Sequence, residues 1–80
     1  MRYQHSFSES FTVRIQNLSV DHRKVILSEL KSVLDLEEPR EKGGEYLKSL
    51  WAYPFQRRSA FICRIDDEKR LIEFLDYICL

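Results

Sequence analysis

The sequence predicts an α+β domain, and the spacing of its apolar residues is the reason. Three C-terminal runs, Ser49–Phe55, Ser59–Ile65 and Leu71–Cys79, are rich in the aromatic, β-branched and leucine residues typical of strands. Apolar residues in Ser19–Leu36 recur instead at helical spacing. A short alternating segment, Met1–Phe7, predicts one more strand. A chain of 80 residues is the size of one domain, so residues 1–80 are expected to share one core.

Polar breaks between the C-terminal runs predict the turns of an antiparallel meander. Pro54 is expected to close the first strand because it has no N–H to give to a ladder, and residues 56–58 then form a turn. Residues 66–69 form a second polar break of hairpin length. The last run is almost continuously apolar, which is typical of a strand covered or flanked on both sides. A bare three-stranded sheet would expose too much apolar surface, so another layer must cover it.

The segment before the meander predicts one helix clearly and leaves a second one open. Ser19–Leu36 begins with a suitable N-cap residue, and Pro39 is expected to stop the helix. The buried face of this helix is predicted to hold Ile26, Leu27, Leu30, Val33 and Leu34. In Glu9–Leu18 the apolar residues fit both a strand and one face of a helix, which Ser8 would cap. Residues 37–46 form a charged loop that contains two adjacent glycines.

The composition limits the function and the compartment. Thirteen basic and thirteen acidic side chains cancel, which argues against a strong non-specific grip on nucleic acid. The N-terminus has no apolar core of a signal peptide, and no run is long enough to span a bilayer. Cys63 and Cys79 lie on adjacent predicted strands but not opposite each other, so a disulfide is not expected. Two free thiols are typical of a reducing compartment, and we expect a cytoplasmic protein without membrane contact.

Residues typical of metal or covalent chemistry are sparse. His5 and His22 have no cysteine or second histidine at ligand spacing, so no metal site and no cofactor are expected. Cys63 lies in the middle of a predicted strand, where a thiol acts as a small hydrophobic side chain rather than a nucleophile. Glycine-rich phosphate loops, paired carboxylates in a supporting context and serine elbows are missing from the sequence.

In its order of elements the chain resembles the RelE/ParE superfamily of toxin–antitoxin toxins. The residues that carry the resemblance are Phe7-Ser8-Glu9, Leu18, Arg23, Leu30, Val33, Leu34, Pro39-Arg40, Leu47-Lys48, Trp51, the hairpin from Phe61 to Lys69, and Leu75-Asp76. The resemblance covers nearly the whole chain. It implies that Glu9–Leu18 is a helix, so that a strand, an αα-hairpin and a three-stranded antiparallel meander follow one another. The helices should pack on one face of the sheet, and the N-terminal strand should pair beside the second or third strand of the meander.

The resemblance also implies a function in translation inhibition. RNA-cleaving members act on mRNA at the ribosome through basic side chains along the sheet, and a small antitoxin lies across the groove between the helical hairpin and the sheet. At positions where the family carries basic residues, this chain has Ala52, Pro54 and Ala60. Lys48 and Arg58 remain as candidate catalytic residues. The candidate RNA-binding residues are Arg40, Lys42, Lys48, Arg57 and Arg58.

Each of these candidates has a plainer alternative. Arg57 and Arg58 fit a solvated hairpin turn that includes Gln56. Arg40 and Lys42 fit an ordinary surface loop, because glutamates are interleaved with them. Trp51, Tyr53 and Phe55 fit either base stacking on an open sheet or packing of the core.

The sequence therefore leaves three candidate functions open. The first is a mRNA interferase-like toxin that cleaves or binds mRNA on the ribosome. The second is a catalytically degenerate or ParE-like protein-binding module, whose partner is an antitoxin, a gyrase-type target or a second copy docked on the C-terminal strand. The third is an RNA-binding adaptor that does not cleave.

Overall fold

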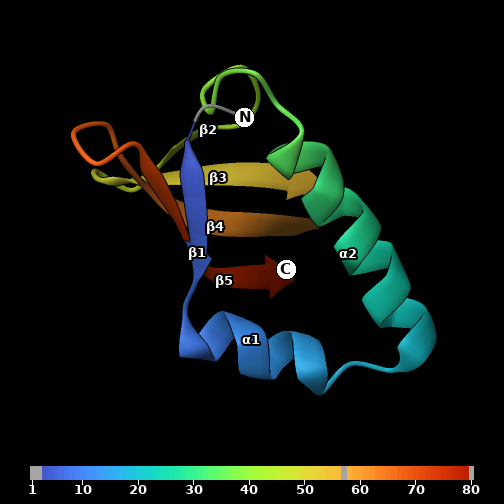
Figure 1. Ribbon diagram of the computed structural model, residues 1–80. Helices are drawn as coiled ribbons and strands as arrows, with labels where there is room; N and C mark the ends of the chain where they lie inside the picture. The colour runs from blue at the N-terminus through green and yellow to red at the C-terminus, as the bar shows by residue number, and fades with distance from the viewer. Residues whose placement is uncertain (1–2, 57, 80) are drawn as a thin grey trace.

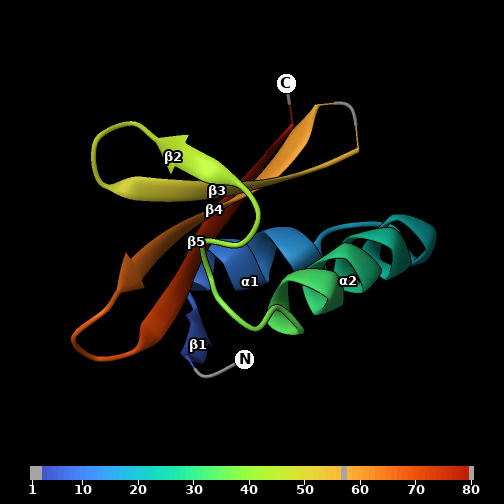
Figure 2. The same cartoon turned by 90° about the horizontal axis from the view of Figure 1, so that it is seen from above.

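The structure, a computed structural model, describes residues 3–56 and 58–79, and the chain folds into two helices and one five-stranded mixed sheet (Figure 1). The elements are β1 (Gln4–Phe7), α1 (Glu9–Gln16), α2 (Val20–Leu34), β2 (Gly44–Tyr46), β3 (Leu50–Phe55), β4 (Ser59–Asp66) and β5 (Leu71–Cys79). The strand order is β1-β5-β4-β3-β2, with β1 parallel to β5 and every other pair antiparallel. Both helices lie on the same side of the sheet (Figure 2).

The predicted α+β fold is confirmed, including the αα-hairpin and the three-stranded meander. The N-terminal strand pairs with the third meander strand, as expected, from Gln4 opposite Leu71 to Phe7 opposite Phe74. The first residues of the predicted strand, 1–2, lie outside the described residues. One strand was not predicted: β2 has only three residues, and it lies in the segment that we expected to be a charged loop.

Tertiary contacts decide the segment that the sequence left open. Ser8 caps α1, because its backbone is extended and its Oγ accepts a hydrogen bond from the Phe11 N–H at 3.1 Å. Phe11 and Ile15, one turn apart, are buried against the sheet. The helix ends at Gln16, two residues before the predicted end. The guanidinium of Arg23 donates to the carbonyl oxygen of Gln16, which the end of the helix leaves unpaired, and to that of Leu18 just beyond the helix.

The second helix differs from its prediction at the C-terminal end and on one face. It ends at Leu34, because Leu36 turns into the core, where it is only 7% exposed. Pro39 therefore does not stop the helix; it is fully buried in the loop beyond it. Leu27 was predicted on the buried face, but it is 45% exposed. The stripe that packs on the sheet is narrower than the apolar pattern and is centred on Ile26 and Leu30.

Pro54 does not close its strand, as we had expected, but pairs with Ala60 inside β3. The short β2 pairs only with Leu50, Trp51 and Ala52, so Pro54 lies where the outer edge of β3 has no neighbour. A proline on an unpaired edge costs the sheet no ladder hydrogen bond, and it makes that edge a poor template for another strand.

The core lies between the helices and the sheet and is built on aromatic rings. Phe61, Cys63, Ile72 and Phe74 are completely buried. The rings of Phe55 and Phe61 stack with their centroids 4.4 Å apart. Tyr53 and Phe55 are buried as well, so for these two residues the packing alternative is confirmed over base stacking.

The two cysteines are far apart in the sheet. Cys79 lies opposite Ser59, four positions along β4 from Cys63, which is roughly 13 Å of extended strand. A disulfide needs Cα atoms within about 7 Å, so both thiols are free. Cys63 is buried and Cys79 is exposed. Burial raises the pKa of the Cys63 thiol, so it is a poor nucleophile.

Candidate functional site

The sheet face opposite the helices is where the resemblance implies a cleavage site, and its centre is apolar. Since Tyr53, Phe55 and Phe61 face the helices, their neighbours in the strands face the other way. One row across β3, β4 and β5 on this face consists of Pro54, Ala60 and Ile78. The neighbouring row contains Ala52, which pairs with Ile62. A hollow of about 260 Å³ on this face is lined by Tyr46, Pro54, Gln56, Arg58, Ser59, Ala60 and Ile78. Among these described residues Arg58 is the one with a charge.

The two candidate catalytic residues lie at opposite ends of one strand. Lys48 lies in the turn before β3, and Arg58 lies in the turn after it. Six residues of strand separate the turns, a span of roughly 20 Å at about 3.3 Å per residue. The fold therefore does not bring Lys48 and Arg58 together on one phosphodiester. Arg57, a candidate RNA-binding residue, lies outside the described residues.

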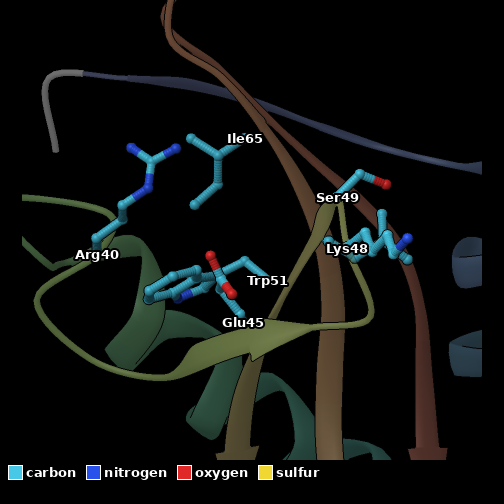
Figure 3. A pocket seen from close by; sticks show the side chains of 7 residues that line it. Arg40, Glu45, Lys48, Ser49, Trp51 and Ile65 are labelled. Atoms are coloured by element: carbon cyan, nitrogen blue, oxygen red, sulfur yellow. The ribbon is translucent and has the colours of Figure 1, made fainter.

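Lys48 and Arg40 line one cavity from opposite sides of Trp51, and the Lys48 side chain points away from Arg40 (Figure 3). This cavity of about 220 Å³ lies on the side of the sheet that carries the helices, next to the loop that follows α2 (Figure 3). The full lining is Arg40, Glu45, Lys48, Ser49, Leu50, Trp51 and Ile65. The lining thus combines two cationic side chains, one carboxylate, one hydroxyl and one indole with the aliphatic residues Leu50 and Ile65. We call this the Trp51 pocket.

An ion pair with Asp67 holds Arg40 in place. Its two terminal nitrogens lie 2.8 and 3.0 Å from the two carboxylate oxygens, a bidentate pair between the α2–β2 loop and the β4–β5 turn. The Tyr3 hydroxyl donates to the same carboxylate at 2.7 Å. The hydrogen bonds from Arg40 and then from Tyr3 hold the pKa of Asp67 below its usual value. Both members of the pair remain about half exposed.

The indole of Trp51 has a fixed orientation in this pocket. Its Nε1–H donates to the carbonyl oxygen of Lys42 at 2.9 Å, and the Arg40 guanidinium carbon lies 5.9 Å from the ring centroid. This geometry requires glycine at position 43, where φ is +85° and a Cβ would lie 2.2 Å from the Ala52 carbonyl oxygen. The Lys42 side chain lines a different hollow, beside Glu29 and Pro54, so it does not join Lys48.

A second feature that the sequence did not predict is an apolar groove between the helices. Its volume is about 230 Å³, and its lining is Phe7, Phe11, Thr12, Ile15, Gln16, Leu27 and Leu30. Phe7 and Leu27 are 41% and 45% exposed, so two large apolar side chains stand at its rim. The helical pattern could not reveal it, because the apolar spacing of Leu27 is the same whether that side chain is buried or exposed.

The edge of β5 proposed for a homodimer is covered in part by α1. The Leu75 carbonyl oxygen accepts from the Ser8 hydroxyl at 2.6 Å, and the Tyr77 carbonyl oxygen lies 3.5 Å from an Arg14 nitrogen. Arg14 also pairs with Asp76 at 3.0 Å. These contacts occupy acceptors that a second copy would need for strand pairing.

Within residues 3–56 and 58–79, histidine, cysteine, aspartate and glutamate side chains form no group of three that could hold a metal ion. The two helices in this part are too short and too polar to cross a membrane.

A five-stranded mixed sheet with two N-terminal helices on one face defines the class of this fold, and solved structures of RelE toxins share it. The toxin–antitoxin complex RelBE2 from Mycobacterium tuberculosis matches with a TM-score of 0.77 at 16% identity, over 100% of this chain and 93% of that chain. The intact RelBE toxin–antitoxin complex of E. coli gives 0.70 at 14% identity, over 98% of this chain and 96% of that chain. The archaeal RelE–RelB complex from Pyrococcus horikoshii OT3 gives 0.65 at 19% identity, over 99% and 96%.

These likenesses confirm the RelE/ParE resemblance as one of fold. No protein-family model matches the sequence, and no curated protein sequence matches it. At 14–19% identity the chain shares the architecture of RelE over nearly its whole length.

Proposed function

We propose that this protein is the toxin component of a type II toxin–antitoxin pair, and that it acts by binding rather than by cutting RNA. The likeness to RelE structures over the whole chain supports the toxin assignment. The apolar row of Pro54, Ala60 and Ile78 supports the absence of cleavage. RNA cleavage without a metal needs side chains that move protons and stabilise the charge of the transition state, which alanine, proline and isoleucine cannot do.

The proposed partner is an antitoxin whose amphipathic helix occupies the groove between α1 and α2. Phe7 and Leu27 leave apolar surface at the rim, and burying it would drive association. Lys24 and Lys31 are exposed and lie one helical turn on either side of Leu27. An antitoxin helix with an acidic flank beside its apolar stripe would complement both features. The pair would act in the cytoplasm, where two free thiols are stable.

A substitution at the groove tests this partner. Leu27→Glu should weaken co-purification with the antitoxin encoded beside the gene by about tenfold or more, because it removes a partly buried contact and adds a charge. Val20→Glu is a matched control, since Val20 is 62% exposed on the same helix and does not line the groove. Equal loss in both variants, or no loss in either, would remove the groove from the proposal. Circular dichroism should show both variants folded.

Ribosome-dependent mRNA cleavage is the second candidate function, and the position of Arg58 favours it. This residue lines the hollow on the open sheet face beside Ala60, so one cation remains where the resemblance implies several. Lys48, at the other end of β3, would have to act on a different part of the RNA.

Induced expression in bacteria, with growth and mRNA ends measured together, separates the two functions. Arrest without new mRNA ends, unchanged in Arg58→Ala and Lys48→Ala, is the result expected for a binding toxin. Arrest with new ends that Arg58→Ala abolishes would establish the cleavage candidate instead. Continued growth at good soluble expression would refute the toxin assignment and leave a RelE-fold protein that only binds a partner.

A further inference from the structure

We propose that a second copy of this chain pairs with the outer edge of β1, so that two sheets join into one across a two-fold axis. β1 is the first strand in the order of the sheet, and no helix or strand lies beyond it in Figure 2. This edge differs from the edge of β5, which α1 covers in part. Self-association at β1 goes beyond the proposed toxin function and does not depend on it.

The backbone of β1 uses only every second residue for pairing inside the molecule. The N–H groups of Gln4 and Ser8 donate to carbonyl oxygens at positions 70 and 74, over 2.8 and 2.9 Å. In a strand the N–H and C=O of one residue point to the same edge, and the edge alternates from residue to residue. His5 and Phe7 therefore direct their N–H and C=O groups to the outer edge, where a further strand can bind them.

The opposite edge of the sheet is protected, whereas the edge at β1 is not. On the opposite side β2 covers only residues 50–52, and Pro54 follows on the uncovered part of β3. Proteins block an edge with proline or charged side chains, because an unblocked edge is a template for another strand. From Tyr3 to Ser8 the sequence has no proline, and His5, neutral at pH 7, is its one titratable base. Two copies therefore meet without like-charge repulsion.

The edge is complementary to itself in one antiparallel register, which favours a second copy as the occupant. With Ser6 on the two-fold axis, His5 of each copy lies opposite Phe7 of the other, and both pairs exchange N–H···O=C bonds. This register satisfies the outward groups of β1 without any residue from outside the strand. The His5 and Phe7 rings lie 5.8 Å apart on one face, and Phe7 is 41% exposed. Pairing covers that surface with the ring of the second copy.

The residue on the axis permits a close approach of the two strands. Ser6 faces Ser6 of the second copy in a non-hydrogen-bonded pair, in which the two Cα atoms lie about 4.5 Å apart. Serine is small enough for this distance. Because β1 has only four residues, the contact is of the small, transient kind. We expect a dimer that exchanges rapidly and is half formed at about 0.1 mM protein.

Sedimentation equilibrium of the intact protein tests the association. Between about 10 µM and about 1 mM the mean mass should rise from one copy toward two. His5→Pro should stay monomeric throughout, because it removes an outward donor and no bond to β5. Val20→Pro is the matched control and should dimerise like the native chain, because Val20 is the exposed first residue of α2, where proline is tolerated. A dimer that His5→Pro leaves unchanged would overturn the proposal.

A disulfide tests the register without weakening the fold. In a Cys79→Ser background the remaining native thiol, Cys63, is buried. Ser6→Cys should then form a covalent dimer on mild oxidation, because Cα atoms about 4.5 Å apart are within disulfide range. Gln4→Cys lies on the same face, but its two copies are at least roughly 13 Å apart in this register, so it should stay monomeric. No covalent dimer from Ser6→Cys, or equal yields from both variants, would overturn the proposal.

Discussion

Replacing Ser8 with alanine removes two hydrogen bonds at once, because one hydroxyl serves both a helix and the sheet. Its oxygen accepts from the Phe11 N–H at 3.1 Å and caps α1. Its proton goes to the Leu75 carbonyl oxygen at 2.6 Å, where β5 has passed the end of β1. Loss of an N-cap costs about 1 kcal/mol, and a partly buried carbonyl left without a donor adds about 1 kcal/mol or more. We expect the free energy of unfolding to fall by about 2 kcal/mol.

Ser19→Ala is the matched control for this prediction. Ser19 caps α2 in the same way, with its oxygen accepting from the His22 N–H at 3.3 Å, but this bond is exposed and the structure gives its hydroxyl no bond to the sheet. Its loss should cost about 0.5–1 kcal/mol. Urea unfolding followed by circular dichroism gives both values, and the slope against urea should not change. Equal losses in Ser8→Ala and Ser19→Ala would refute the reasoning that the Ser8–Leu75 bond ties α1 to the sheet.

Two further predictions concern the thiols and the Arg40–Asp67 pair. A thiol reagent should modify Cys79 rapidly, because that thiol is exposed, and Cys63 only after unfolding, because that thiol is buried and its pKa is raised. Rapid modification of both cysteines in the folded protein would contradict the packing of β4. The pKa of Asp67 is held low by Arg40, so its contribution to stability is complete above about pH 4 and is lost as the pH falls through the folded-state pKa. Asp67→Asn should therefore reduce the fall in the free energy of unfolding between pH 6 and pH 2, measured by urea unfolding. The same fall in the variant as in the native protein would contradict the ion pair.

Local chemistry explains which parts of the fold were predictable. Ser8 and Ser19 lie at the starts of the helices, and the almost continuously apolar last run coincides with the whole of β5. These features depend on residues within a few positions of one another. The end of α2 depends instead on Leu36 reaching the core, and the exposure of Leu27 depends on how far α1 lies from α2. Neither the burial of Leu36 nor the separation of the two helices is encoded in the spacing of apolar residues.

The candidate site was less predictable for the same reason. Lys48 and Arg58 are near each other in the sequence, yet a straight strand holds them apart. Arg40 and Asp67 are 27 positions apart, yet a loop and a hairpin turn bring them into contact. The sequence identified basic residues in this region as candidates, but only the sheet register and the loop path show that Arg40 lies beside Trp51 and lines the same cavity as Lys48.

The parallel pairing of the first and last strands has a consequence for how the protein is made. Ser8 and its partner Leu75 are 67 residues apart, so the sheet cannot close until β5 has been synthesised. The meander of β3, β4 and β5 is local and can form first, whereas β1 and α1 must wait for β5 to become available. Until then Phe7 and Phe11 have no sheet to pack on. The emerging polypeptide therefore carries Phe7 and Phe11 unburied until β5 has been made, and β5 is the strand that completes the sheet.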